Sequence, residues 1–235
     1  LLSRAIPEEQ VQSIIIVVHD KEHKELWERD LAFFWPNVQV LPFPITERVE
    51  FTTVACSLEG QGAQMRALSM LAWNRPVVVI ATIEEATQYV VSPQYVISQS
   101  VHLEVYQSTE RDELLEKLVK IGYERVDQVE QRGHFSVRGD IFDIFPVNSD
   151  DPIRMEFFGD EIDTMRHFSV DTQRSIETID SYTVTPFFLT SDDADSTLLS
   201  YAKDGLIIYD EPVRIQEALK KFLKEDATYR KQHCE

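Results

Sequence analysis

Two uninterrupted runs of apolar, mostly β-branched residues constrain the fold of this chain more than any other feature. The run VQSIIIVV covers residues 11–18 and the run PVVVIA covers residues 76–81. Beyond residue 13, neither run contains the alternating polar residues that a half-exposed strand needs. Strands buried on both faces are typical of parallel sheets that helices cover on both sides. The sequence therefore predicts an α/β unit built on a parallel sheet.

Amphipathic segments around these runs complete the α/β pattern. Thr82 and Glu85 form the T-x-x-E pattern of a capping box, which predicts a helix start directly after the second run. A further helix is expected from Pro212 to about Lys224, because proline is well tolerated in a first helical turn. Apolar spacing predicts helices at residues 21–35 and 59–74, and strands at residues 38–41 and 205–209.

The middle of the chain has a different texture, that of an α+β domain inserted into the α/β lobe. Polar and apolar residues alternate around residues 101–105, and a helix predicted at residues 109–121 ends at Gly122. Half-buried strands are then expected at residues 134–138, 141–145, 153–158, 161–168 and 176–185. The predicted boundaries are 1–96 for the first part of the lobe, 97–184 for the inserted domain and 185–235 for the second, truncated part.

The charge and the cysteine count limit the classes of partner and compartment. With 41 acidic and 23 basic residues, the chain carries a net charge of −18 and repels phosphate, so a protein partner is favoured over nucleic acid. No apolar run approaches the roughly 20 residues that cross a bilayer, so we expect no membrane partner. Cys56 and Cys234 are too few to staple a secreted scaffold, which favours a reducing compartment, the cytoplasm.

Motifs for metal or nucleotide chemistry are weak. His19 and His23 have the i, i+4 spacing of zinc ligands on a helix, but HDKEH is not HExxH and the sequence places no third ligand. We therefore expect a solvated helix start. The phosphate-loop pattern G-x-x-x-x-G-K-[ST] is absent, and Gly60 and Gly62 are expected to begin a helix. We predict no catalytic, cofactor-binding or metal-binding residues.

An acidic pair follows the last predicted strand, where an ATPase would hold its magnesium ion. This pair, Asp210 and Glu211, directly precedes Pro212. Without a phosphate loop, the two carboxylates are expected to cap the following helix, where its dipole favours negative charge.

A hairpin around Gly159 and Asp160 is the most informative segment. The two-residue turn predicts the cross-strand pairs 158/161, 157/162, 156/163, 155/164 and 154/165. The resulting core face carries Ile153, Met155, Phe157 and Ile162. The opposite face carries Arg154, Glu156, Phe158, Glu161 and Asp163. An exposed aromatic residue beside arginine is typical of a protein-binding hot spot, although another element of this chain covering Phe158 stays equally open. Arg138 is expected as a second exposed arginine.

Two long motifs resemble a known module. They are RGHFSVRGDIFDIFP (132–146) and DPIRMEFFGDEIDTMRHFSVDTQRS (151–175), followed later by GLIIYDEP (205–212). They resemble the module shared by the bacterial excision-repair subunit UvrB and the transcription-repair coupling factors. The segments LPFPITERVEF (41–51) and GAQMRALSMLAWNRPVVVIAT (62–82) fit the same module, so the resemblance covers nearly the whole chain.

The resemblance favours the coupling factors over UvrB. UvrB carries a phosphate loop, a tyrosine-rich hairpin and a D-E-[SA]-H motif, none of which is found here; residues 37–75, where that hairpin would lie, contain no tyrosine. The resemblance implies a degenerate helicase-type parallel-sheet lobe with an inserted UvrA-binding domain, part of a longer protein. Other parts of the family's full-length members bind RNA polymerase and translocate on double-stranded DNA with ATP and Mg²⁺.

Carried onto this sequence, the resemblance implies three UvrA contacts. They are Arg138 of S-V-R-G-D, Arg154 of P-I-R-M-E and Phe158, the second phenylalanine of F-F-G-D. Two alternatives stay open: a structural brace for the motor domains, which predicts that these residues are buried or self-paired, and a residual nucleotide-binding helicase fragment.

Overall fold

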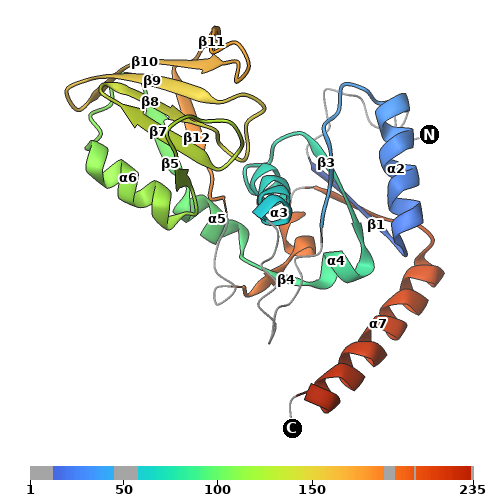
Figure 1. Ribbon diagram of the computed structural model, residues 1–235. Helices are drawn as coiled ribbons and strands as arrows, with labels where there is room; N and C mark the ends of the chain where they lie inside the picture. The colour runs from blue at the N-terminus through green and yellow to red at the C-terminus, as the bar shows by residue number, and fades with distance from the viewer. Residues whose placement is uncertain (1–12, 45–57, 188–193, 204, 234–235) are drawn as a thin grey trace. The chain divides into compact units, whose positions relative to one another are not determined.

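The computed structural model describes residues 13–44, 58–187, 194–203 and 205–233, and these form two compact units (Figure 1). Unit 1 comprises Leu1–Cys56, Met70–Pro93 and Ala194–Glu235, and unit 2 comprises Ser57–Ser69 and Gln94–Asp193. Cys56 and Cys234 lie outside the described residues, as does most of the segment 41–51. The domain boundaries at 96/97 and 184/185 stay a prediction, because compactness alone does not define an independently folding domain.

Unit 1 contains the predicted parallel sheet, with four strands in the order β14-β1-β3-β2. The strands are β1 (Ser13–Val18), β2 (Val40–Pro42), β3 (Val77–Thr82) and β14 (Leu206–Tyr209). β1 lies between β14 and β3, and all six of its residues are buried, as are all six of β3. The two β-branched runs are therefore the sheet's central strands, as the sequence predicts.

Helices and short elements accompany this sheet. They are α2 (Lys21–Phe34), α4 (Ile83–Thr87), η3 (Leu198–Tyr201), α7 (Pro212–His233) and the paired short strands β4 (Tyr89–Val90) and β13 (Ser196–Thr197). Leu31 and Trp35 pack on Ile14, Ile16 and Val78 in a buried cluster. α7 extends well past the predicted end at Lys224. Among the described residues, no helix is both long and apolar enough to cross a membrane.

The predicted capping box at the start of α4 is confirmed and is joined by a buried ion pair. The Thr82 N–H donates to Glu85 Oε2 at 2.8 Å, and the Glu85 N–H donates to Thr82 Oγ1 at 3.2 Å. Lys24 Nζ donates to the same Glu85 oxygen and to the Phe43 carbonyl, each at 2.7 Å. The pair therefore links α2 to α4 inside unit 1.

Unit 2 has the mixed α+β character predicted for the middle of the chain, and it also includes Ser57–Ser69, which the predicted boundaries place in the lobe. The main sheet of unit 2 has the order β11-β10-β9-β8-β7-β6 and is antiparallel except for the parallel pair β6–β7. The strands are β6 (Glu124–Arg125), β7 (His134–Arg138), β8 (Ile141–Ile144), β9 (Ile153–Phe158), β10 (Glu161–Phe168) and β11 (Ser175–Thr178). β5 (Val101–Glu104) and β12 (Ser181–Val184) form a separate antiparallel pair. α5 (Pro93–Gln99) and α6 (Arg111–Lys120) are its own helices.

One face of the main sheet forms the core of unit 2. Leu114 and Leu118 of α6 are buried in one cluster with Phe135, Phe142 and Met155 of the strands. Figure 1 shows α6 running beside β7 and β8. The four residues predicted for the core side of the hairpin are all buried.

A third helix, α3 (Leu58–Ala72), contributes most of its length to unit 2. Phe187, which is 8% exposed, lies against two glycines. A Cβ added at Gly62 of α3 would lie 3.0 Å from the Phe187 ring, and one added at Gly133 would lie 2.7 Å from it. Gly133 also has a φ of +89°, so only glycine fits there without strain.

Two details of the predicted strands are wrong. The pairs 158/161 and 157/162 are present, but a β-bulge between Ile162 and Thr164 shifts the rest of the hairpin by one residue, so that Arg166 opposes Arg154. The predicted strand 176–185 is two strands, because the chain leaves β10 after β11 and pairs with β5 as β12.

Candidate protein-binding face

The side of the main sheet opposite the core carries all three residues that the resemblance marks as contacts. Strand alternation sets this placement: Asp143 lies between the buried Phe142 and Ile144, and it pairs across β8–β9 with Arg154. We call this side the outer face, defined by Arg138, Asp143, Arg154, Glu156, Phe158 and Arg166.

Asp143 is the centre of the outer face. Its side chain is 1% exposed and accepts hydrogen bonds from Arg154 Nε at 2.7 Å, Arg154 Nη2 at 2.8 Å and Arg138 Nη2 at 3.0 Å. The two bonds from Arg154 form the bidentate geometry that makes arginine–carboxylate pairs strong and directional. Hydrogen bonding to Asp143 raises the pKa of the Arg154 guanidinium above its ordinary value. One buried carboxylate thus fixes two guanidinium groups.

The prediction that Arg154 is exposed is wrong. Only 14% of its side chain is accessible. Besides Asp143, its Nη2 donates to Gln173 Oε1 at 3.0 Å, and its guanidinium carbon lies 4.4 Å from the centre of the Phe168 ring. A carboxylate, an amide and an aromatic ring therefore enclose the Arg154 guanidinium. Alternation along β9 predicts which face Arg154 lies on, but not that other side chains cover it.

Arg138 is exposed, as predicted. It ends β7, and half of its side chain is accessible while Nη2 stays bonded to Asp143. Rotamer entropy normally weakens the binding contribution of a free surface arginine. The bond to Asp143 restrains Arg138 before any partner binds, while half of its side chain stays accessible.

Phe158 is the most exposed large apolar residue among the described residues, at 84%. It is the last residue of β9 and precedes Gly159, whose φ of +65° makes the tight turn to β10. The open alternative, in which another element covers this ring, is excluded for the described part of the chain. An exposed aromatic ring on the same sheet face as a restrained arginine has the chemistry of an interface hot spot.

Sequence reasoning missed two partners on this face. Arg166 lies opposite Arg154 and donates to the Glu156 carboxylate; the bulge after Ile162 hid it, because the unshifted register places Met165 there. Asp143 was detectable, since F-D-I puts a lone carboxylate between two core residues on the side that Arg154 occupies.

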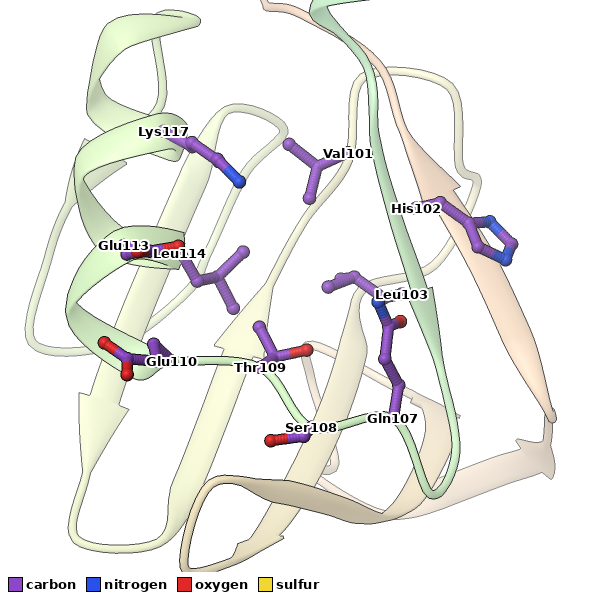
Figure 2. Close-up of a pocket in the computed structure, with 10 residues that line it drawn as sticks. All are labelled: Val101, His102, Leu103, Gln107, Ser108, Thr109, Glu110, Glu113, Leu114 and Lys117. Carbon is purple, nitrogen blue, oxygen red and sulfur yellow. The ribbon is translucent and has the colours of Figure 1, made fainter.

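Unit 2 also contains a cavity of about 240 Å³, separate from the residues predicted for binding (Figure 2). It lies between β5 and α6, and its lining includes Thr109, Glu110, Glu113 and Lys117. Cofactor and small-molecule sites usually measure about 300 to 1,000 Å³ and are mainly apolar. This cavity is smaller, and its lining mixes apolar with polar and charged side chains, so the outer face is the stronger candidate site.

Comparison with known proteins bears on this face. Residues 101–188, which contain every residue of the outer face, match the UvrB interaction domain family. The chain is 30% identical over 186 residues to the transcription-repair-coupling factor of Bacillus subtilis, covering 79% of this chain and 16% of that protein. The predicted resemblance to the UvrB-like module of transcription-repair coupling factors is confirmed.

Other transcription-repair-coupling factors match this chain over similar lengths. A transcription-repair-coupling factor of Staphylococcus aureus is 29% identical over 221 residues, covering 91% of this chain and 18% of the relative. One of Mycobacterium tuberculosis is 32% identical over 180 residues, covering 74% and 14%. The chain thus spans roughly a sixth of the length of the curated relatives it matches.

Proposed function

We propose that this chain is a non-catalytic interaction module that binds UvrA through the outer face and so recruits excision repair to stalled transcription. The observation that carries the proposal is the 84% exposure of Phe158 on the same sheet face as the half-exposed Arg138, in a segment matching the UvrB interaction domain. Alternation along β9 places Phe158 on the outer face. Exposing a phenylalanine ring to water is unfavourable, and this supports a role for the ring in contacting a partner.

The three residues contribute differently in this proposal. Phe158 supplies apolar area that UvrA covers, and Arg138 pairs with a UvrA carboxylate, each contributing on the order of 1 to 3 kcal/mol. Arg154 contacts UvrA through the small exposed part of its side chain. It also fixes Asp143, which in turn orients Arg138.

The remaining activities are proposed for parts of the longer protein outside this chain. These parts bind RNA polymerase and double-stranded DNA and use ATP and Mg²⁺ for translocation. The module itself needs no cofactor in this proposal, since its sequence lacks a phosphate loop. A cytoplasmic location goes with these partners.

A structural brace is the second candidate, and one observation favours it. Arg154 is already bonded to Asp143 and Gln173 within the chain, as a purely structural arginine would be. This reading gives no reason for the exposure of Phe158, so recruitment remains the better proposal.

Calorimetry of the purified chain with UvrA tests the proposal. Phe158→Ala and Arg138→Ala should each weaken binding about tenfold or more, or about 1.4 kcal/mol. The unfolding midpoint of Phe158→Ala in urea should stay near wild type, because substitutions at such exposed positions usually change stability by less than about 0.5 kcal/mol. Arg138→Ala also removes one hydrogen bond to the buried Asp143, so its midpoint should fall, and its affinity is compared at a temperature where circular dichroism shows it folded. Arg154→Ala should weaken binding and also lower stability.

Matched exposed residues of unit 1 provide the controls. Phe33 of α2 is 78% exposed and the Arg29 side chain is 71% exposed, so Phe33→Ala and Arg29→Ala remove the same groups elsewhere. Both should bind UvrA as the wild type does. If the folded wild type does not bind, the brace becomes the better account; binding that all three outer-face variants retain would keep UvrA as partner and reject the face.

A further inference from the structure

Unit 1 carries a second side-chain cluster that the proposed function does not use. His19 and Asp20 directly follow β1, His23 lies in the first turn of α2, and Glu211 follows β14. β1 and β14 are parallel neighbours, so their carboxyl ends lie at the same edge of the sheet. In open α/β sheets, ligands bind at this edge where the chain's progression reverses direction. Here it reverses at β1, with β3 and β2 on one side and β14 on the other.

The three residues after β1 converge around one carboxylate. Asp20 Oδ2 lies 3.1 Å from His19 Nε2, and Asp20 Oδ1 lies 2.9 Å from His23 Nδ1. One candidate ligand atom from each residue lies within 4.8 Å of the other two. The sequence predicts a solvated helix start here because it places no third ligand beside the histidines; the structure supplies Asp20.

The two separations between carboxylate oxygen and imidazole nitrogen, 3.1 and 2.9 Å, are close to those around a bound first-row divalent cation. Zinc binds imidazole nitrogen and carboxylate oxygen at about 2.0 to 2.2 Å. At tetrahedral or octahedral angles, ligand atoms at that distance lie about 3.0 to 3.5 Å from one another. Two imidazoles with one carboxylate match the ligand preference of Zn²⁺ and its neighbours, whereas Mg²⁺ and Ca²⁺ prefer oxygen alone. Asp20 and His23 are partly exposed, so water can complete the coordination sphere.

Glu211 provides the outer-shell contact that such sites use. His19 Nδ1 is buried, has no hydrogen-bond partner among the described residues and lies 3.7 Å from Glu211 Oε2. If Nδ1 carries the proton and donates a hydrogen bond to this carboxylate, the Nε2 lone pair, which lies 3.1 Å from Asp20 Oδ2, is free to bind a metal. Carboxylates in this position fix the tautomer of a metal-bound histidine. Arg214 Nη1 lies 3.1 Å from the same Glu211 oxygen and restrains it from the other side.

We propose that His19 Nε2, Asp20 and His23 bind a divalent first-row transition cation of the Zn²⁺ class, with Glu211 as a positioning residue for His19. The role of Asp20 as helix cap is compatible with this site. Its Oδ1 accepts the His23 backbone N–H at 2.9 Å, while Oδ2 faces His19 and is available to the metal.

Titration of the whole metal-free chain with Zn²⁺ by calorimetry, and with Co²⁺ by visible absorption, tests the proposal. One equivalent should bind, and Co²⁺ should give the weak visible bands of nitrogen and oxygen ligation. An intense near-ultraviolet thiolate band would instead assign the metal to Cys56 or Cys234 and overturn the proposal. His23→Ala should abolish this binding, and Glu211→Gln should weaken it by about 10- to 100-fold.

His102→Ala is the matched control, because the His102 side chain is 56% exposed and lies on β5 of unit 2. It should bind Zn²⁺ as the wild type does. Equal losses in the His102 and His23 variants, or none in either, would show binding by scattered surface histidines and overturn the site. UvrA binding is measured on the other unit's residues, so failure of either proposal leaves the other intact.

Discussion

Among the described residues, each unit holds one almost fully buried carboxylate, and the two are used differently. Glu85 in unit 1 is paired with Lys24, and both side chains are at most 10% exposed. Asp143 in unit 2 is 1% exposed and pairs with one enclosed arginine, Arg154, and one half-exposed arginine, Arg138. The first arrangement joins two helices and ends inside the unit. The second joins the buried Asp143 to the half-exposed Arg138, so that a positive charge is held in one place at the surface.

Removing the cation of the enclosed pair should produce the largest change in stability. Lys24→Met leaves Glu85 as a buried carboxylate without its counter-ion, which typically costs about 3 to 5 kcal/mol. Urea unfolding measures this cost. The affinity of the folded protein for UvrA should not change, because Lys24 belongs to unit 1.

Lys221→Met is the control for that experiment. Lys221 is 78% exposed and lies 3.9 Å from Glu225, a pair of the kind that contributes at most a few tenths of a kcal/mol. If Lys24→Met destabilises no more than Lys221→Met does, the enclosed pair does not stabilise unit 1.

Neutralising the carboxylate of the outer face should change both stability and binding. Asp143→Asn removes the charge that holds Arg138 and Arg154 together, which should lower stability by about 1 to 3 kcal/mol. UvrA affinity should fall about tenfold, although Asp143 itself is buried, because Arg138 loses its restraint. Glu177→Gln, at an exposed position of β11, should change neither quantity. Wild-type affinity in folded Asp143→Asn would contradict the positioning role.

Replacing Asp150, an exposed carboxylate that pairs with two arginines, should give the smallest change in stability. Asp150 pairs with Arg66 and Arg132, but its own side chain is 74% exposed. The hydrogen bond from Arg66 holds the pKa of Asp150 below its ordinary value of 3.8. The pair therefore stabilises the folded state above pH 4 and loses this contribution as the pH falls toward the lowered pKa.

Asp150→Asn should accordingly cost less than about 1 kcal/mol at pH 7, after allowance for solvent screening. The difference from the wild type should shrink when unfolding is measured at pH 3. A difference that grows on acidification would reverse the sign expected for a depressed carboxyl pKa.

Apolar runs and capping motifs predicted most of the fold, because which residues are apolar depends on which residues are buried, and a capping motif involves only residues close in sequence. The runs of β1 and β3 have no polar alternation, and the structure buries them on both sides; Thr82 and Glu85 cap a helix through contacts only three residues apart. The bulge after Ile162 was not predictable from alternation, because one unpaired residue leaves little trace in the sequence. It misplaced the partner of Arg154 and concealed Arg166.

The candidate site was predictable only in part for a similar reason. The exposure of Phe158 and Arg138 follows from their places at strand ends, but the burial of Arg154 depends on Phe168 and Gln173, which reach it through tertiary packing. The break between β11 and β12 likewise depends on the distant strand β5.

The packing of Phe187 has a consequence for anyone who dissects this protein. The helix residue beneath its ring, Gly62, lies outside the segment 101–188 that the family comparison delimits. A gene fragment cut at those limits would expose the ring and remove Arg66, the partner of Asp150. Such a fragment should self-associate more readily than a fragment that also carries residues 57–69 joined covalently to it.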